Sequence, residues 1–480
     1  MALPRLTSSV WLEMWAGAVL LGSTVVDLAR AQFATTSLYH FLFVPLTLGL
    51  APLVATMQTI WHRTGDDAWL RLTRFFGTLL LINFAIGVAT GLVQEFQFGM
   101  NWSVYSKYVG NVFGAPLAIE GLAAFFLEST FLGLWIFGWN RLSPRIHLAT
   151  IWLATLGTWL SAYFILVANS WMQHPVGSKV ENGQAVLTSV WSLLSATFAL
   201  WAFGHTMFAS LTVGAVVVLG VSCWHFARGH DVEVFRRSAK LALIVLVPVA
   251  AVNLWFGSHF GIYTTEQQPM KIASTEAQWN NCQPCAFSLF QIGGFTQSDQ
   301  TPSFSIQVPR LLSFLATGSF NGAVVGINEN QKTERRQYGR GNYIPPVRAV
   351  YWSMRIMAYL GTLVFLVAAL GAYLLWRGRL ERARWFQWTA VVSIAFPFLA
   401  ALAGWVLTEV GRQPWIVQGL LRTDQANSPS VSTTWLGISL GFFLGLYLFL
   451  GVLDFILMRR YAKPDRPAPQ EELPAPAVTY

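Results

Sequence analysis

The sequence predicts an all-α fold, a polytopic bundle of about nine membrane-spanning helices with one long polar loop outside the membrane. Of its 480 residues, 54% are hydrophobic and only 11% are charged, whereas soluble domains carry about 25% charged residues. Nine separate apolar segments reach the length of about 20 residues that a spanning helix needs. The net charge of +9 would suggest nucleic acid in a soluble protein. In a membrane protein it indicates basic cytoplasmic loops, so we expect lipid and no nucleic acid as a partner.

The expected spans follow the apolar segments in order: 35–61, 72–96, 113–139, 146–171, 195–226, 239–261, 349–376, 386–409 and 432–458. An earlier apolar segment, 14–26, is too short to span and has charged flanks, so it is interpreted as an interfacial helix or a signal-peptide core. The chain therefore divides into an N-terminal extension (1–34), helices 1–6 (35–261), a polar loop (262–348), helices 7–9 (349–458) and a disordered tail (459–480).

The distribution of Lys and Arg between alternate short loops predicts the orientation. One set of loops holds 16 basic residues and the opposite set holds four, Lys107, Lys179, Arg412 and Arg422. The basic set is expected in the cytoplasm. This places the N-terminus and the 262–348 loop outside and the C-terminus in the cytoplasm.

The long outer loop is expected to be functional, because structureless loops of this length are uncommon. It contains aromatic residues and a patterned run from Phe304 to Leu315. Its Cys282 and Cys285 form a lone C-x-x-C, which is a disulfide if the loop is outside the cell, or a chance spacing. Zinc is not expected, because no second pair of ligands has zinc-site spacing.

Six groups that a bilayer disfavours lie within or at the ends of apolar segments: His40, Glu120, Glu128, His205, Arg355 and Glu409. Such residues are functional candidates, because an unpaired ionisable group at membrane depth is costly. Imidazole and methionine side chains are haem ligands. At 1.5 Å per residue, the candidate ligands fall in the outer half of the membrane. A membrane redox enzyme is therefore predicted.

His205 and Met357 together suggest a six-coordinate haem, a geometry suited to electron transfer. Arg355 is expected to pair with a haem propionate. Glu409, with Trp405 nearby, would favour a high-spin iron with an open position. The alternatives are ordinary core packing for Met357 and an interfacial pair with Arg412 for Glu409.

Glu120 and Glu128 are eight residues apart, so on a regular helix they lie 80° from alignment and can both face the bundle interior. Buried carboxylic acids can exchange protons near neutral pH. The pair is predicted to relay protons from the inner side, with water-lined packing as the alternative.

Several stretches resemble subunit I of the cytochrome bd quinol oxidases. They are YHFLFVPLT at 39–47, the run 99–128 with GAPLAIEG and FFLEST, VANSWMQ at 167–173, GHT at 204–206, RIM at 355–357 and GRQPW at 411–415. The similarity extends over residues 28–460. The chain departs from the family pattern in about 20 extra N-terminal residues and in the two loop cysteines.

The resemblance implies roles for individual residues. His205 and Met357 match the iron ligands of a low-spin haem b, with Arg355 beside it, and His40 matches a ligand at the haem d position. Glu409 matches the ligand of a high-spin haem b, with Trp405 nearby. Glu120 and Glu128 match a carboxylate at the oxygen-reducing haem and a proton-path residue. Lys271 and Glu276 match the K-x-x-x-x-E motif of the quinol-binding loop. Arg30 and Asn169 match supporting positions.

The function implied is that of a terminal respiratory oxidase in the bacterial plasma membrane. It oxidises ubiquinol or menaquinol at the outer face and reduces dioxygen to water with cytoplasmic protons. Two haems b and one haem d are expected as cofactors, or a third haem b in a cyanide-insensitive enzyme of the same family. Subunit II is the expected partner, with a small single-helix subunit as a further one. A membrane cytochrome without oxidase activity and a secondary transporter are the alternatives. Matched broken helices and internal repeats, which are common in transporters, are not evident.

Overall fold

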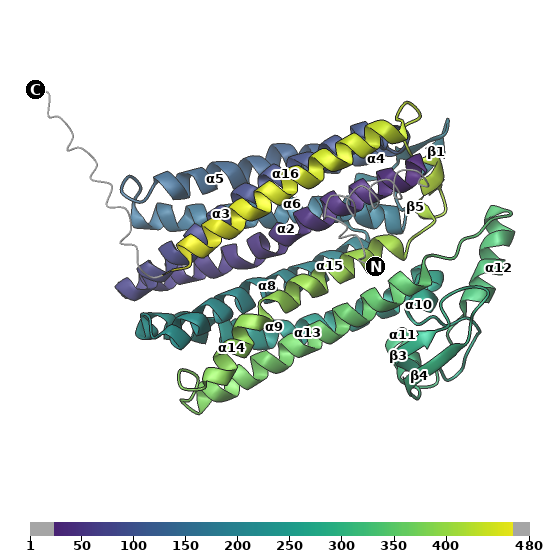
Figure 1. Ribbon diagram of the computed structural model, residues 1–480. Coiled ribbons are helices and arrows are strands. Elements are labelled where there is room, and N and C mark those ends of the chain that lie inside the picture. The colour runs from purple at the N-terminus through teal and green to yellow at the C-terminus, as the bar shows by residue number, and fades with distance from the viewer. Residues whose placement is uncertain (1–23, 464–480) are drawn as a thin grey trace, which may run out of the picture.

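The structure is a computed structural model that describes residues 24–463, in which long helices run side by side in one bundle (Figure 1). Within that range, nine helical segments are long and apolar enough to cross a membrane. They are α2 (Val25–Thr64), α3 (Asp67–Met100), Ser103–Phe137, α6 (Pro144–Gln173), Val190–Arg228, α9 (Val232–Gln267), α13 (Val347–Trp376), Arg384–Val410 and α16 (Thr433–Tyr461). The predicted all-α membrane fold and its nine spans are confirmed.

Three of these segments are interrupted. The third comprises α4 (Ser103–Ile119), a π-helical turn η1 (Glu120–Phe125) and α5 (Phe126–Phe137). The fifth comprises the short α7 (Val190–Leu194) and α8 (Thr197–Arg228), and the eighth comprises α14 (Arg384–Ser393) and α15 (Ala395–Val410). A π-turn inside an α-helix often marks a functional site, and η1 begins at Glu120.

The first span begins ten residues earlier than expected, because a capping box fixes its start. Thr24 accepts a hydrogen bond from the Asp27 backbone, and Asp27 accepts one from the Thr24 backbone, which satisfies two otherwise free backbone groups. The boundary expected after residue 34 therefore falls inside α2. The expected interfacial or signal segment lies largely outside the described residues, as does nearly all of the tail expected to be disordered.

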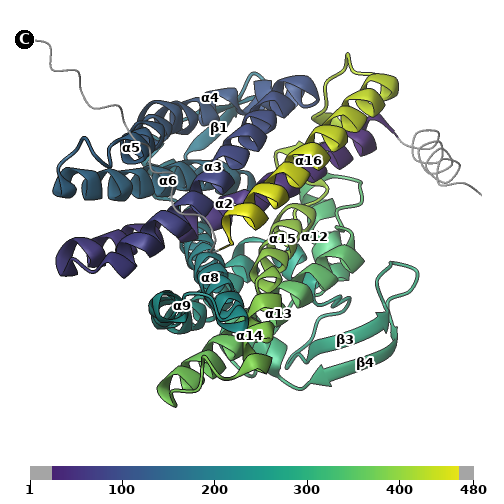
Figure 2. The ribbon, with the colours of Figure 1, turned by 60° about the vertical axis from the view of Figure 1, so that its left-hand side comes forward.

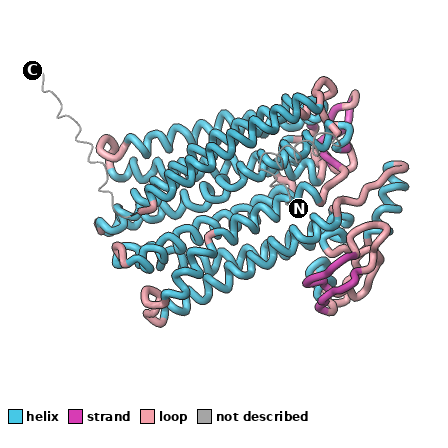
Figure 3. The backbone as a smooth tube through the Cα atoms, viewed as in Figure 1, coloured by secondary structure: helices cyan, strands magenta, loops and turns pink. Residues whose placement is uncertain are grey.

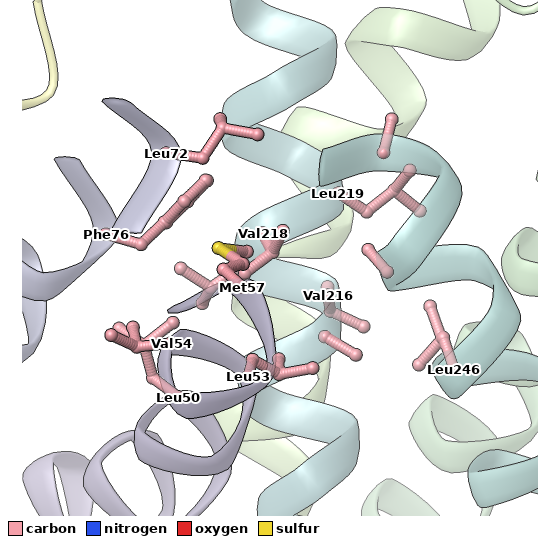
Figure 4. Packing of buried hydrophobic residues seen from close by; sticks show 14 of the residues in the cluster. Leu50, Leu53, Val54, Met57, Leu72, Phe76, Val216, Val218, Leu219 and Leu246 are labelled. Carbon is pink, nitrogen blue, oxygen red and sulfur yellow. The ribbon is translucent and has the colours of Figure 1, made fainter. Parts of the chain in front are cut away.

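The centre of the bundle is an apolar core shared by α2, α3, α8 and α9 (Figure 4). Leu50, Val54 and Met57 of α2 are fully buried there. At Gly49, α2 approaches α8 so closely that a Cβ atom would lie 1.8 Å from the Ser210 carbonyl oxygen. Small residues permit this kind of backbone approach between membrane helices.

The polar segment between α9 and α13 is folded and lies at one end of the bundle (Figures 1 and 2). It contains α10 (Pro269–Thr275), an antiparallel hairpin of β3 (Phe287–Gly293) and β4 (Pro302–Val308), α11 (Leu311–Thr317) and α12 (Ile327–Tyr338). The run from Phe304 to Leu315 is thus divided between a strand and a helix.

The remaining strands form two short hairpins at the same end (Figure 3). They are β1 (Ser178–Glu181) with β2 (Gln184–Leu187), and β5 (Trp415–Val417) with β6 (Leu421–Arg422), which precedes the 3-10 turn η2 (Thr423–Gln425). The helix ends and short turns at the opposite end of the bundle carry a set of basic residues, among them Arg63, Arg141, Arg236, Arg379 and Arg459.

Candidate functional site

His40 lies in α2 against a glycine of α3. Its Nδ1 is 2.9 Å from the Thr90 hydroxyl, and a Cβ on Gly91 would lie 3.1 Å from its ring. Thr90 itself donates to backbone carbonyls of its own helix. Thr90 therefore orients one ring nitrogen, which is the arrangement expected of a histidine that uses its other nitrogen to bind iron.

His205 and Met357 also lie against bare helix backbone. A Cβ on Gly257 of α9 would lie 2.9 Å from the His205 ring, and a Cβ on Gly404 of α15 would lie 2.9 Å from the Met357 sulfur. Among residues 24–463, the buried His205 Nδ1 has no hydrogen-bond partner. Each side chain thus lies beside a glycine of a neighbouring helix. Among the described residues, no hydrogen bond or ring contact connects His205 with Met357.

Glu409, near the C-terminal end of α15, is held by two neighbouring polar groups. Asn169 of α6 donates to its Oε1 at 2.7 Å, and Arg412 donates to its Oε2. One turn before Glu409, the Trp405 ring stacks on Phe41 of α2 with centroids 5.1 Å apart. The pair expected between Glu409 and Arg412 is present, and a carboxylate retains lone pairs for a metal beside these two donors.

Arg355 is buried where α13 meets the polar segment. Its guanidinium forms a bidentate ion pair with Glu276, at 3.1 and 2.7 Å, and also donates to the carbonyls of Ser288 and Thr275. Both side chains are almost fully buried. Arg355 therefore fastens α10 and β3 of the polar segment to α13, and its donors are already engaged by protein groups.

Lys271 of α10 is buried rather than exposed to solvent. Its ammonium donates to the Gln173 side chain at 2.6 Å, and its stem packs against Gly411. Burial lowers the pKa of Lys271 to about 7, with Arg412 lowering it further and Glu409 opposing this. The two motif residues Lys271 and Glu276 therefore lie against the Glu409 region and Arg355, respectively.

Glu120 and Glu128 both lie against α6. Ser161 donates to the Glu120 carboxylate at 2.7 Å, and a Cβ on Gly157 would lie within 3.0 Å of the Glu128 backbone and its Cβ. Ser161 and Gly157 are one turn apart on the same face of α6. Glu128 is buried and Glu120 is partly buried, so the pair follows one helix–helix seam.

Arg30 and the cysteines are the remaining residues that the sequence singled out. Arg30 is half-buried in the second turn of α2 and forms no ion pair within residues 24–463. Cys282 and Cys285 form a disulfide, which resolves the two alternatives left by their spacing. Cys223 is a buried free thiol.

Sequence reasoning missed the residues that support these side chains, among them Thr90, Ser161, Gln173 and Glu334. Glu334 of α12 lies beside Trp415, whose indole donates to its carboxylate at 3.4 Å. Burial raises the pKa of Glu334 to about 7, and the Trp415 hydrogen bond opposes this. A Glu in a polar loop gives no signal of burial, so only the fold reveals it.

The family described as cytochrome bd terminal oxidase subunit I matches residues 28–466. The chain belongs to this family. The subunit 1 of cytochrome bd ubiquinol oxidase from Bacillus subtilis is 44% identical, over 91% of this chain and 93% of that protein. The subunit 1 of cytochrome bd-II ubiquinol oxidase from Escherichia coli is 38% identical, over 94% and 98%. The bd oxidase structure from Geobacillus thermodenitrificans superimposes with a TM-score of 0.82 at 25% identity, over 92% of this chain and 99% of that one.

Membership of this family makes the chain a subunit of a terminal oxidase and implies haem cofactors. The residues present fit haem. Planar macrocycles need flat space beside their axial ligands, and His40, His205 and Met357 each stand at a glycine where a Cβ would crowd them. The His205 Nδ1 is buried and has no partner within residues 24–463. The Glu409 carboxylate is held by two donors. Both groups are suited to a metal-binding environment.

Proposed function

We propose that the chain is the catalytic subunit of a quinol oxidase that oxidises quinol at the outer face and reduces dioxygen to water. The observation that carries this proposal is the packing of the polar segment against residues that neighbour the candidate haem ligands, Gly411 and Arg355. Lys271 lies beside the Glu409–Arg412 pair, and Glu276 is bound to Arg355, two residues from Met357. A substrate at the folded segment would therefore be separated from the redox centres by a few side chains.

His205 and Met357 are assigned to a low-spin haem b, Glu409 with Trp405 to a high-spin haem b, and His40 to haem d or a third haem b. When bound, haem iron supplies the electron transfer and the oxygen chemistry. The protein orients the ligands: Thr90 fixes the His40 ring, and Asn169 with Arg412 fixes the Glu409 carboxylate. Arg30 is assigned a supporting role beside these cofactors.

Protons for water formation are assigned to the Glu128–Glu120 seam along α6, entering from the cytoplasm. The basic turns at the end of the bundle opposite the polar segment support a cytoplasmic location for that end. Quinol and oxygen chemistry on one side and proton entry on the other would separate charge across the membrane without a pumping step.

The substrate is assigned to the quinols, since the Bacillus subtilis and Escherichia coli relatives are named as ubiquinol oxidases. Lys271 and Glu276 are the proposed polar contacts on the polar segment, reached by movement of α10, because both are buried. Subunit II is the proposed partner, with a small single-helix subunit as a second one, and the bacterial plasma membrane is the proposed location.

One preparation tests this function. The assembled oxidase should show a reduced-minus-oxidised haem spectrum and should consume oxygen with quinol. His205→Ala and Met357→Leu should each abolish the low-spin haem b signal. A colourless protein would refute the proposal, as would quinol-independent oxygen uptake, and an unchanged spectrum in both variants would refute the ligand assignment.

A further inference from the structure

The β3–β4 hairpin exposes its apolar face and buries polar side chains. Phe290 pairs with Ile306 and Ile292 pairs with Phe304, and residues two apart on a strand point to the same side of a sheet. These four side chains form the apolar hairpin face, and each is between 39% and 55% exposed. Gln291, on the opposite face, is 4% exposed. A half-solvated antiparallel sheet normally buries its apolar side, so this pattern is inverted for a hairpin in water.

The hairpin is attached along the first part of α13. The Phe290 ring lies 5.4 Å from the Trp352 ring, centroid to centroid. Two turns further along α13, the Tyr359 hydroxyl donates to the Leu289 carbonyl. Strand β3 therefore follows α13 from Trp352 to Tyr359, and Figure 2 shows the hairpin at the side of the bundle.

This part of α13 lies at the depth of the membrane boundary. The helix has 30 residues and is therefore about 45 Å long, whereas the hydrocarbon core is about 30 Å thick. Shared between both helix ends, the excess of about 15 Å places the start of the hydrocarbon roughly five residues into α13, near Trp352. Tyr359 is deeper, so β3 crosses the level at which the membrane surface meets the hydrocarbon. Trp and Tyr are enriched at this level.

The exposed side of α13 continues the apolar hairpin face. Ile356 lies one turn beyond Trp352, and Leu363 lies two turns beyond Ile356, and both are exposed. Residues at this spacing share one side of a helix. Because α13 is long and apolar enough to span a membrane, these side chains face lipid or a neighbouring subunit. The hairpin and α13 thus present one apolar surface, joined where Phe290 meets Trp352.

Polar parts of the hairpin limit how deep it can lie. Its turn, residues 294–301, contains the exposed Asp299. Phe295 of this turn contacts Tyr351, near the start of α13, so the turn points away from the membrane centre. Arg310 follows β4 and is exposed, and a long basic side chain at this depth reaches the lipid headgroups. The described sheet has two strands, and open sheet edges do not occur in hydrocarbon. The hairpin therefore fits the boundary between headgroups and acyl chains.

We propose that the β3–β4 hairpin is an interfacial membrane anchor, whose apolar face enters the lipid leaflet at the polar-segment end of the bundle. Amphipathic elements of this kind bury their apolar face about 5–10 Å into the leaflet. Lipid is favoured over a protein partner, because the hairpin face continues the surface of a membrane-spanning helix at the level of the membrane boundary. The anchor holds the polar segment at the membrane surface.

Nitroxide labels on the assembled oxidase in liposomes test the anchor. Ile306→Cys reports on the hairpin face, Leu363→Cys is the lipid reference, and Gln297→Cys, in the exposed turn, is the matched control in water. The three native cysteines do not compete for the label, because two form a disulfide and the third is buried.

The collision rates of each label with oxygen and with a water-soluble nickel chelate are measured by power saturation. Because the chelate is excluded from the bilayer, the ratio of oxygen to nickel collisions should be roughly tenfold higher at Ile306→Cys than at Gln297→Cys. Equal ratios at these two positions would overturn the anchor. A label at residue 306 that is shielded from both reagents would show a protein partner and would overturn it as well.

A measurement on the wild type keeps the inference testable where the labelled variants fail to assemble. The oxidase is reconstituted with phosphatidylcholine that carries a diazirine on its acyl chain, and the irradiated protein is mapped by mass spectrometry. Residues 287–308 should carry lipid adducts, whereas the polar β1–β2 hairpin, with its exposed Lys179–Glu181 pair, should not. Adducts on α13 without any on residues 287–308 would overturn the anchor. Neither measurement uses quinol oxidation, so its result is independent of the proposed function.

Discussion

The buried ion pair between Glu276 and Arg355 should fix the polar segment to the bundle. Glu276→Gln keeps the shape of the side chain but removes its charge, and leaves the Arg355 guanidinium buried without a counter-ion. The two N–H···O bonds measure 2.7 and 3.1 Å, and the side chains are 1% and 3% exposed. Removing one partner of such a pair typically destabilises by about 3–5 kcal/mol. Because each 1.4 kcal/mol is tenfold, local opening should increase roughly a hundredfold or more.

Amide hydrogen exchange of residues 269–293 in the assembled oxidase measures this opening directly. Glu329→Gln is the control, since Glu329 pairs with Lys332 in the same segment at 3.0 Å but the two side chains are 37% and 63% exposed. Exposed pairs contribute about 1 kcal/mol or less, so this control should change exchange by less than about tenfold. If residues 269–293 were equally protected from exchange in Glu276→Gln and Glu329→Gln, the buried pair would not be what holds the polar segment on the bundle.

Three further outcomes are expected. Burial raises the pKa of Glu334 to about 7, so the folded state binds the proton more tightly than the unfolded chain does. The docking of α12 should therefore weaken as pH rises from about 5 to 8, and Glu334→Gln should remove this dependence in limited proteolysis. Glu128→Gln should slow quinol-driven oxygen uptake with the haem spectrum retained, and full turnover would exclude Glu128 from the proton path. Gly404→Ala should perturb the low-spin haem spectrum, because its Cβ would lie 2.9 Å from the Met357 sulfur, whereas Gly441→Ala, with open space around it, should not.

The helices could be predicted from sequence because the bilayer imposes a length and a composition on each of them. Their ends could not, since hydropathy loses its signal outside the hydrocarbon region. The start of α2 is set by the side chains of Thr24 and Asp27, and α9 continues through polar residues to Gln267. Local capping interactions and contacts with the polar segment decide these boundaries. Neither contributes to a mean hydropathy over about 20 residues.

The candidate ligands could be identified because an imidazole or a carboxylate is conspicuous in an apolar segment. Their partners were harder to predict. Glu276 and Arg355 are 79 positions apart in the chain, and Gln173 and Lys271 are 98 apart. A Gln or Lys in a polar segment looks solvent-exposed until the fold covers it. The pairing of Arg355 with a haem propionate stays a prediction. The pair with Glu276 could not be predicted, because the two residues lie in different segments of the chain.

The π-helical turn at Glu120 gives the clearest case of local geometry that the sequence pattern could not supply. On a regular α-helix, eight residues rotate a side chain through about 800°, which leaves Glu120 and Glu128 about 80° apart. A π-turn includes one extra residue in each hydrogen-bonded loop. Eight residues that contain such a turn therefore rotate about the helix axis about as far as seven residues of a regular α-helix. Seven steps give about 700°, or 20° from alignment. Accordingly, the Glu120 carboxylate accepts from Ser161 of α6, and the backbone and Cβ of Glu128 lie against Gly157 of α6, one turn apart on one face. The turn from Glu120 to Phe125 therefore aligns both acids on a single seam, which is the geometry that a proton relay between them requires.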